Sequence, residues 1–289
     1  MRKMKSEKMK WKTLGLFGLL FALGLGFSDL NAGSIDLLQG ARRIWLKSGI
    51  EFYLNSEDKN HVLVKKVGEN YDVDINMSEK FPAASLIKIP VMIASYEKMN
   101  EQGNIDEKIE ARVLRMTAMS DNRESNWLIR WLGMDYINKV MEKYNIENTR
   151  IVENIPSNGK TYRNMTNAQD IADMLEMIYQ GKFAFSDKML YALEQQQRGK
   201  DRIRKYLPKD SRIYHKTGTI AGGMYDAGIV DDEIIVVAFD NPNVRKSQKN
   251  IVTWARNRKE AIAQISRQVF DSNKERERSL VDDYWGVWR

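Results

Sequence analysis

The chain has 289 residues, a length that suits one large domain or two small ones. Its 43% apolar and 29% charged residues are typical of a globular protein and exclude a disordered or fibrous chain. The lack of cysteine excludes disulfide scaffolds, thiolate metal sites and cysteine nucleophiles, and two histidines leave little room for a histidine-rich metal site. We therefore expect neither a metal nor a cofactor.

The net charge of +7 is concentrated at the N-terminus. Residues 1–12 carry a net charge of +5, whereas residues 33–289 carry only +3. A body this mildly basic gives no electrostatic reason to expect nucleic acid as a partner.

The basic start is followed by fourteen residues, 14–27, that are made only of Leu, Gly, Phe and Ala. This pattern is typical of a signal peptide, and the run is shorter than the roughly 20 residues that span a bilayer. We predict that residues 1–32 are a signal peptide or an N-terminal membrane anchor, in which residues 13–27 contact the membrane. A buried N-terminal helix is the alternative. The protein is then expected to be exported, to the extracellular space or the cell envelope.

The first element predicted after this segment is a helix that begins at the cap residue Ser34 and ends at Gly49. Strands are predicted over 50–54 and 61–67, on either side of a polar turn. A mostly helical stretch follows over 84–205. Its amphipathic segments are 86–99, 123–132, 134–144 and 167–180.

Strands return after Pro208 and are predicted over 212–219, 226–230 and 233–239. Hairpin turns separate them at Gly222-Gly223 and at Asp231-Asp232. A last amphipathic helix is predicted over 247–270, and a charged, aromatic tail over 272–289.

This order of elements predicts an α/β (α+β) fold, an antiparallel sheet flanked by helices and interrupted by a mostly helical insertion. One domain is predicted over 33–271. Its sheet lobe comprises 33–83 and 206–271, and its helical lobe comprises 84–205. A cleft is expected where the insertion meets the sheet.

The first motif with chemical potential is Ser85-Leu86-Ile87-Lys88. Positions i and i+3 share one face of a helix, so the serine hydroxyl and the lysine amine can meet. Lys88 lies in an apolar run, and burial lowers the pKa of a lysine, so the amine can act as a base toward the hydroxyl. The spacing also arises by chance, as in the polar turn from Ser56 to Lys59. Pro90 predicts a kink or a short first turn.

The second motif is Ser120-Asp121-Asn122. Asp121 followed by Glu124 is a capping-box pattern, which predicts a helix start. The same loop can offer the Ser120 hydroxyl and the Asn122 carboxamide to a cleft.

The third motif is Lys216-Thr217-Gly218, followed by Thr219, on a predicted strand. Alternation places Lys216 and Gly218 on one face of the strand and the two threonines on the other. Gly218 would admit a substrate backbone close to the strand. An edge strand protected by a lysine is the alternative. We interpret the neighbouring His215 as structural.

Together and in this order, the three motifs resemble those of penicillin-recognising serine acyl hydrolases, above all the class A β-lactamases and related DD-peptidases. The resemblance covers roughly residues 34–270 and includes Asp226-Ala227-Gly228-Ile229-Val230 on the strand after the third motif. It implies that 33–271 is a β-lactamase-like catalytic domain. It also implies a small-molecule β-lactam or a peptidoglycan peptide as substrate. We expect a monomer.

The resemblance also implies a role for each motif. Ser85 would be the acylated nucleophile and Lys88 its proton partner. Ser120 would pass a proton to the leaving nitrogen, and Asn122 would hold the amide side chain of the substrate. Lys216 and Thr217 would bind the substrate carboxylate, with Lys216 also polarising Ser120. The backbone amides of Ser85 and Thr219, the latter next to Gly218, would form the oxyanion hole.

The chain departs from the family pattern in three places. Only thirty-five residues separate Ser85 from Ser120, so we expect a more open cleft. The loop between Arg150 and Thr166 is short and holds one carboxylate, Glu153, as candidate base for hydrolysis of the acyl-enzyme; a solvated loop residue is the alternative. The strand after the third motif has no arginine for the substrate carboxylate.

Three functions fit this sequence. The first is a class A-like β-lactamase that hydrolyses β-lactams through an acyl-serine intermediate. The second is a DD-peptidase acting on peptidoglycan stem peptides. The third is a β-lactam-binding sensor that is acylated without turnover. The lack of a clearly placed base for hydrolysis of the acyl-enzyme favours the second and third functions.

Overall fold

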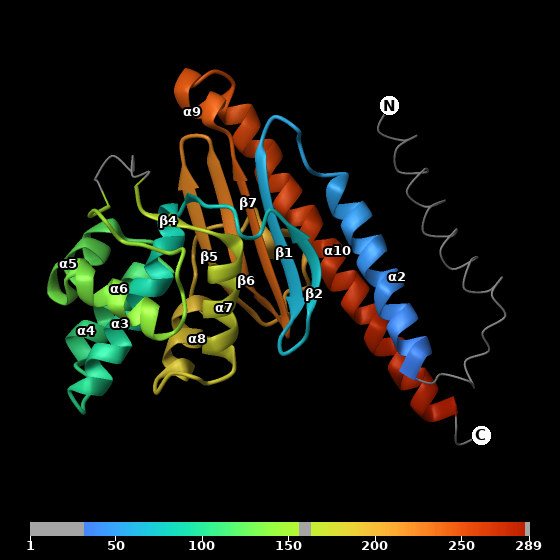
Figure 1. The fold of residues 1–289 in the computed structure, drawn as a ribbon, viewed down its shortest axis with the longest axis horizontal. Coiled ribbons are helices and arrows are strands. Elements are labelled where there is room, and N and C mark those ends of the chain that lie inside the picture. The colour runs from blue at the N-terminus through green and yellow to red at the C-terminus, as the bar shows by residue number, and fades with distance from the viewer. Residues whose placement is uncertain (1–31, 156–162, 287–289) are drawn as a thin grey trace. The chain divides into compact units, whose positions relative to one another are not determined.

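A computed structural model describes residues 32–155 and 163–286, apart from the side chains of 32–38 and 275–286 (Figure 1). The predicted signal peptide or anchor therefore lies outside the described residues, except for Ala32. The described residues divide into two compact units, one formed by 32–52 with 271–286 and the other by 53–155 with 163–270. No helix in the described ranges has the length and apolar character needed to cross a bilayer.

The first unit contains helix α2 (Ala32–Glu51) and the end of helix α10 (Ile251–Gly286). The helix predicted from Ser34 is confirmed, but the strand predicted over 50–54 is wrong. Ile50 lies one helical turn after Leu46 and both side chains are fully buried, so α2 continues through residues of high strand propensity. The tail predicted from residue 272 continues α10 instead, because its Lys, Glu and Arg residues are good helix formers.

A five-stranded antiparallel sheet forms the centre of the second unit. Its strands are β1 (Lys59–Lys66), β2 (Tyr71–Ile75), β5 (Ile213–Ile220), β6 (Gly223–Val230) and β7 (Glu233–Asp240). Their order is β2-β1-β7-β6-β5. The pairing of β1 with β7, in the register Leu63↔Val236, joins the two halves of the sheet across the helical insertion. The predicted fold class is thus confirmed, and β5 lies at an edge.

The three predicted C-terminal strands form, but β6 begins at Gly223, three residues before the predicted start, so that only Gly222 of the predicted glycine pair lies in the turn. Gly222 has a φ of +66°, and a Cβ atom there would lie 2.4 Å from the Asn241 carbonyl oxygen, so this tight turn needs glycine. Asp231, with a φ of +56°, turns the chain between β6 and β7. Every residue of β6 and β7 is buried, because elements cover both faces of the sheet.

The insertion contains six helices among the described residues: α3 (Lys88–Glu101), α4 (Glu107–Ala118), α5 (Asn122–Leu132), α6 (Met134–Lys143), α7 (Ala168–Tyr179) and α8 (Ser186–Glu194). Four were predicted, and α4 and α8 were not. Helix α3 is central and contacts α4, α5, α6 and α7. Pro90 lies in its first turn, where no intrahelical N–H is needed.

Short elements complete the second unit. They are β3 (Phe81–Pro82), β4 (Met165–Thr166), the 3-10 helices η2 (Ala84–Ile87) and η3 (Ile203–Tyr206), and α9 (Pro242–Ser247). Figure 1 shows α7 and α8 in front of the sheet, and the part of α10 that belongs to the second unit, up to Phe270, behind it. On the α10 side, the Arg258 guanidinium lies 5.1 Å from the Phe239 ring centroid of β7. The Trp254 indole N–H donates to Asp58 at 2.9 Å.

Candidate active site

The first motif lies where η2 passes into α3. Ser85 is the second residue of η2, so its backbone N–H belongs to the first turn of a helix, where amides lack intrahelical partners. Ala84 before it has a φ of +46°, a left-handed conformation that is rare outside glycine and concentrated at functional sites. The turn is held by its fully buried neighbours Leu86 and Ile87.

Lys88 is fully buried, and its amine lies at the centre of a polar cluster. The Nζ atom donates to Ser85 Oγ at 3.1 Å, to Ser120 Oγ at 3.1 Å and to Asn122 Oδ1 at 2.8 Å. Burial is the main cause that lowers the pKa of Lys88 to about 7, and the nearby Arg198 guanidinium lowers it further while Asp121 opposes the shift. A substantial neutral fraction therefore exists near pH 7, and a neutral amine can take the Ser85 proton.

The second motif crosses from α4 to α5. Ser120 has a φ of +57°, which turns the chain before Asp121 caps α5 by accepting from the Arg123 and Glu124 amides. Only half of the predicted capping box forms, because the Glu124 carboxylate pairs with Arg112 at 2.6 Å. The strained turn delivers the Ser120 hydroxyl to the cluster around Lys88.

The third motif supplies a second buried lysine from β5. Lys216 is fully buried and its Nζ atom donates to Ser120 Oγ at 3.1 Å. Burial and then the nearby Lys88 lower the pKa of Lys216 well below its ordinary value, with smaller contributions of the same sign from arginines. Ser120 is thus held between two lysines, and its hydroxyl can relay a proton between them and a bound substrate.

Gly218 is required by packing within the protein. A Cβ atom at this position would lie 2.8 Å from the Tyr225 ring and 3.3 Å from Leu86 Cγ, so a side chain would separate β5 from the turn that carries Ser85. The space expected for a substrate backbone is therefore filled by protein atoms on this face. Thr217 and Thr219, on the other face, line the cleft as alternation predicted.

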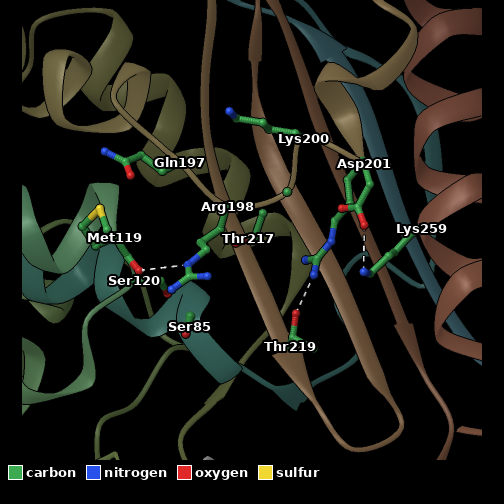
Figure 2. A pocket seen from close by; sticks show the side chains of 12 residues that line it. Ser85, Met119, Ser120, Gln197, Arg198, Lys200, Asp201, Thr217, Thr219 and Lys259 are labelled. Atoms are coloured by element: carbon green, nitrogen blue, oxygen red, sulfur yellow. Dashed lines mark hydrogen bonds and ion pairs between the residues drawn. The ribbon is translucent and has the colours of Figure 1, made fainter. Parts of the chain in front are cut away.

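The cleft has a volume of about 680 Å³ and unites the three motifs (Figure 2). Ser85, Ser120, Thr217 and Thr219 line it. The rest of the lining comes mainly from the segment 197–202, together with Met119 and Lys259. This segment was not predicted from the sequence, in which its only local signal is a cluster of cations before the third motif.

Arg202 is the one buried residue of the segment 197–202. Its guanidinium is buried and donates to the Thr219 hydroxyl at 2.6 Å and to the carbonyl oxygens of Tyr225 and Gly218 at 2.6 and 3.1 Å. Its Nε atom is buried without a hydrogen-bond partner, and it forms no ion pair within the described residues. The negative charges of Asp226 and Asp201 act on the guanidinium from farther away and oppose the lowering of its pKa by burial, and its place on the cleft wall allows it to attract an anion as well. Strand β6 itself carries no arginine, and Arg202 brings a guanidinium to the cleft from another segment.

Two further residues lie away from the reacting groups. Glu153 is not among the described residues that line the cleft; its carboxylate lies 3.8 Å from the Arg163 guanidinium and accepts from the Arg163 amide at 3.4 Å. Its assignment as hydrolytic base stays a prediction. His215 is buried and bonds through Nδ1 to Asp226 at 3.0 Å, in agreement with a structural role.

The fold and the site geometry together are those of the penicillin-recognising serine hydrolases. The sequence model of the Beta-lactamase enzyme family matches residues 46–115 and 113–272, and the chain belongs to this family. Family and fold support β-lactam hydrolysis as the activity.

Solved structures with the same fold include a β-lactamase from Sphaerobacter thermophilus DSM 20745, with 21% identity, 78% of this chain and 97% of that chain covered, and a TM-score of 0.65. A class A β-lactamase from Bacteroides cellulosilyticus DSM 14838 has 20% identity, coverages of 80% and 99%, and a TM-score of 0.67. TLA-1 extended spectrum β-lactamase has 20% identity, the same coverages and a TM-score of 0.68. No curated protein matches the chain in sequence.

Proposed function

We propose that the protein hydrolyses β-lactams through an acyl-enzyme formed on Ser85. The observation that carries this proposal is the unbroken chain of contacts from Ser85 Oγ through Lys88 Nζ and Ser120 Oγ to Lys216 Nζ, each 3.1 Å long, at the base of the cleft. Acyl transfer needs a nucleophile, a base and an acid for the leaving group. In this series of contacts Ser85 is the nucleophile, Lys88 the base and Ser120 the acid.

In acylation, neutral Lys88 takes the Ser85 proton as the Ser85 oxygen attacks the lactam carbonyl. The C–N bond of the lactam then breaks, and Ser120 passes its proton to the leaving nitrogen while Lys88 returns one to Ser120. The backbone N–H groups of Ser85 and Thr219 are our candidates for the oxyanion hole. Asn122 accepts from Lys88 through Oδ1, which leaves its amide nitrogen to hold the substrate side chain.

The substrate carboxylate is assigned to Thr217, Lys216 and Arg202. Arg202 fits this role because it is a buried cation that lines the cleft. Its hydrogen bond to the Thr219 hydroxyl joins the carboxylate site to the strand that carries the motif.

Intact-protein mass spectrometry after mixing with benzylpenicillin tests the proposal. We expect a mass increase equal to one penicillin, located on Ser85 by peptide mapping, followed by its loss as hydrolysed product is released. Ser85→Ala should form no adduct, whereas Ser56→Ala, which removes the serine of the chance Ser-Lys spacing in a surface turn, should behave as wild type. A permanent adduct would favour the sensor, and turnover of D-alanyl peptides with poor penicillin hydrolysis would favour the DD-peptidase.

We also propose that residues 1–32 direct export and that the protein is a monomer. The basic start and the apolar run support export. A chain that starts at Gly33 should be folded and monomeric in size-exclusion chromatography with light scattering. If that chain aggregates while the full chain in detergent stays monomeric and folded, residues 1–32 are part of the fold.

A further inference from the structure

The cleft contains two cations that the proposed reaction does not use. Arg198 and Lys200 line the cleft, and both side chains are exposed. Neither forms an ion pair in the described ranges 32–155 and 163–286, whereas Lys259 on the same wall is paired with Asp201 at 2.7 Å. Unpaired cations on a concave surface raise the local concentration of anions.

Arg198 lies beside the residue that serves the leaving group. Its Nε atom donates to the Met119 carbonyl oxygen at 3.4 Å, directly before Ser120, and Figure 2 shows its side chain reaching between Ser120 and Thr217. The guanidinium makes no other side-chain hydrogen bond in the part of the chain that the structure describes, so its terminal nitrogens can bind a carboxylate in bidentate fashion. Its charge also reaches both catalytic lysines, since it lowers the pKa of Lys88 and of Lys216.

Arg198 and Arg202 are therefore separate anion sites. Arg202 is buried and fixed to β5 through Thr219, which suits the carboxylate next to the bond that breaks. Arg198 is exposed and lines the cleft beside Ser120. Lys200, which is also exposed and lines the cleft, adds a second positive charge from the same segment.

We infer that the site prefers acyl donors whose leaving group carries two carboxylates, the first bound at Thr217 and Arg202 and the second at Arg198. This inference rests on the proposed acyl transfer at Ser85 and names the substrate class for it. The leaving side of a simple penicillin has one carboxylate, so such a compound leaves the Arg198 site empty. An amide or ester of an amino- or thio-dicarboxylic acid fills both sites.

Two thioesters with the same N-acylglycyl group and different leaving thiols test the inference. One releases mercaptoacetate, with one carboxylate, and the other mercaptosuccinate, with two. Ser85 Oγ forms a bond to the acyl carbon, the C–S bond breaks, and the Ser85 proton ends on the departing thiol. Release of free thiol gives kcat/KM for each compound.

For wild type we expect kcat/KM to be about five- to tenfold higher for the mercaptosuccinate ester, the value of one well-placed guanidinium–carboxylate pair. The preference should decline with added salt. Arg198→Gln should reduce it to about twofold or less. Arg256→Gln removes the same charge from an exposed position on α10 and should keep the wild-type preference.

Equal kcat/KM values in wild type, or an unchanged preference in Arg198→Gln, would overturn the inference. Calorimetry measures the binding of both esters to Ser85→Ala. Because binding needs no acyl transfer, this measurement tests the inference separately from the proposed function. A lower Kd for the mercaptosuccinate ester without turnover by wild type would keep the inference and overturn the acyl transfer. Equal Kd values would overturn the inference alone.

Discussion

The amines of Lys88 and Lys216 converge on one oxygen atom, the hydroxyl of Ser120, each at a distance of 3.1 Å. Both side chains are fully buried, and burial lowers the pKa of each; the charge of Lys88 lowers the pKa of Lys216 further. Two ammonium groups so close together in a medium of low dielectric constant repel each other strongly. The arrangement therefore favours a state in which at least one amine is neutral and available as a base.

The acylation rate should depend on pH through Lys88. Its pKa is lowered to about 7, so the amine is protonated and inactive as a base below that value and becomes neutral as the pH rises through it. The second-order rate constant for acylation by a penicillin should rise about fivefold from pH 6 to pH 7, about tenfold from pH 6 to pH 8, and level off above pH 8. A rate that is flat from pH 5 to pH 9 would contradict Lys88 as the base.

Ser85→Ala should reduce acylation by about 10,000-fold or more, because the nucleophile is lost. Ser120→Ala should slow acylation while leaving the label on Ser85, since the acid and not the nucleophile is removed. Peptide mapping of the adducts distinguishes the two variants. A label on Ser120, or an undiminished label in Ser85→Ala, would reverse the assignment.

Arg202→Gln should raise KM for carboxylate-bearing substrates by about 10- to 100-fold, the usual effect of losing a charge-assisted hydrogen bond. The affinity for a substrate methyl ester should change much less. Circular dichroism and thermal melting serve as the control for folding, because the guanidinium also bonds to two backbone carbonyls. An equal loss of affinity for the carboxylate substrate and for its methyl ester would show that Arg202 has only a structural role.

Acyl-enzyme should accumulate before steady hydrolysis begins, because the carboxylate of Glu153 is engaged by Arg163 and does not line the cleft among the described residues. A misplacement of about 1 Å can cost two orders of magnitude in rate. Stopped-flow detection of a burst measures this. A longer adduct lifetime in Glu153→Gln would support the predicted base, and an unchanged lifetime would assign hydrolysis to another group.

Gly218→Ala should destabilise the protein by about 1–3 kcal/mol, since the added methyl group meets Tyr225 at 2.8 Å. Acylation should also decline, because β5 would be pushed from the turn that carries Ser85. Gly40→Ala is the matched control: no atom lies within 4 Å of its added Cβ in α2, so the change should be neutral or stabilising by up to about 1 kcal/mol. Urea unfolding measures both, and equal effects would contradict the packing role.

The groups at the reaction centre were predictable from local spacing. Ser85 and Lys88 are three residues apart at the start of a helix, and Asp121 caps the next helix, so short-range geometry fixes how these side chains meet. The hairpins of β5, β6 and β7 were predictable for the same reason, because turn residues and alternation act within a few residues.

The error at 50–54 and the missed arginines have a different origin. Ile50, Phe52 and Tyr53 have strand propensity, but burial of Ile50 with Leu46 outweighs that small preference. Arg198 and Arg202 belong to a segment without periodicity, whose place is set by packing: Gly199, with a φ of +79°, lies so close to Thr217 that an added Cβ would be 2.3 Å from its methyl group. Contacts between residues distant in the chain leave no regular spacing in the sequence. The motifs therefore indicate the chemistry that we propose, whereas the cations to which we assign substrate selection become visible only when the chain is folded.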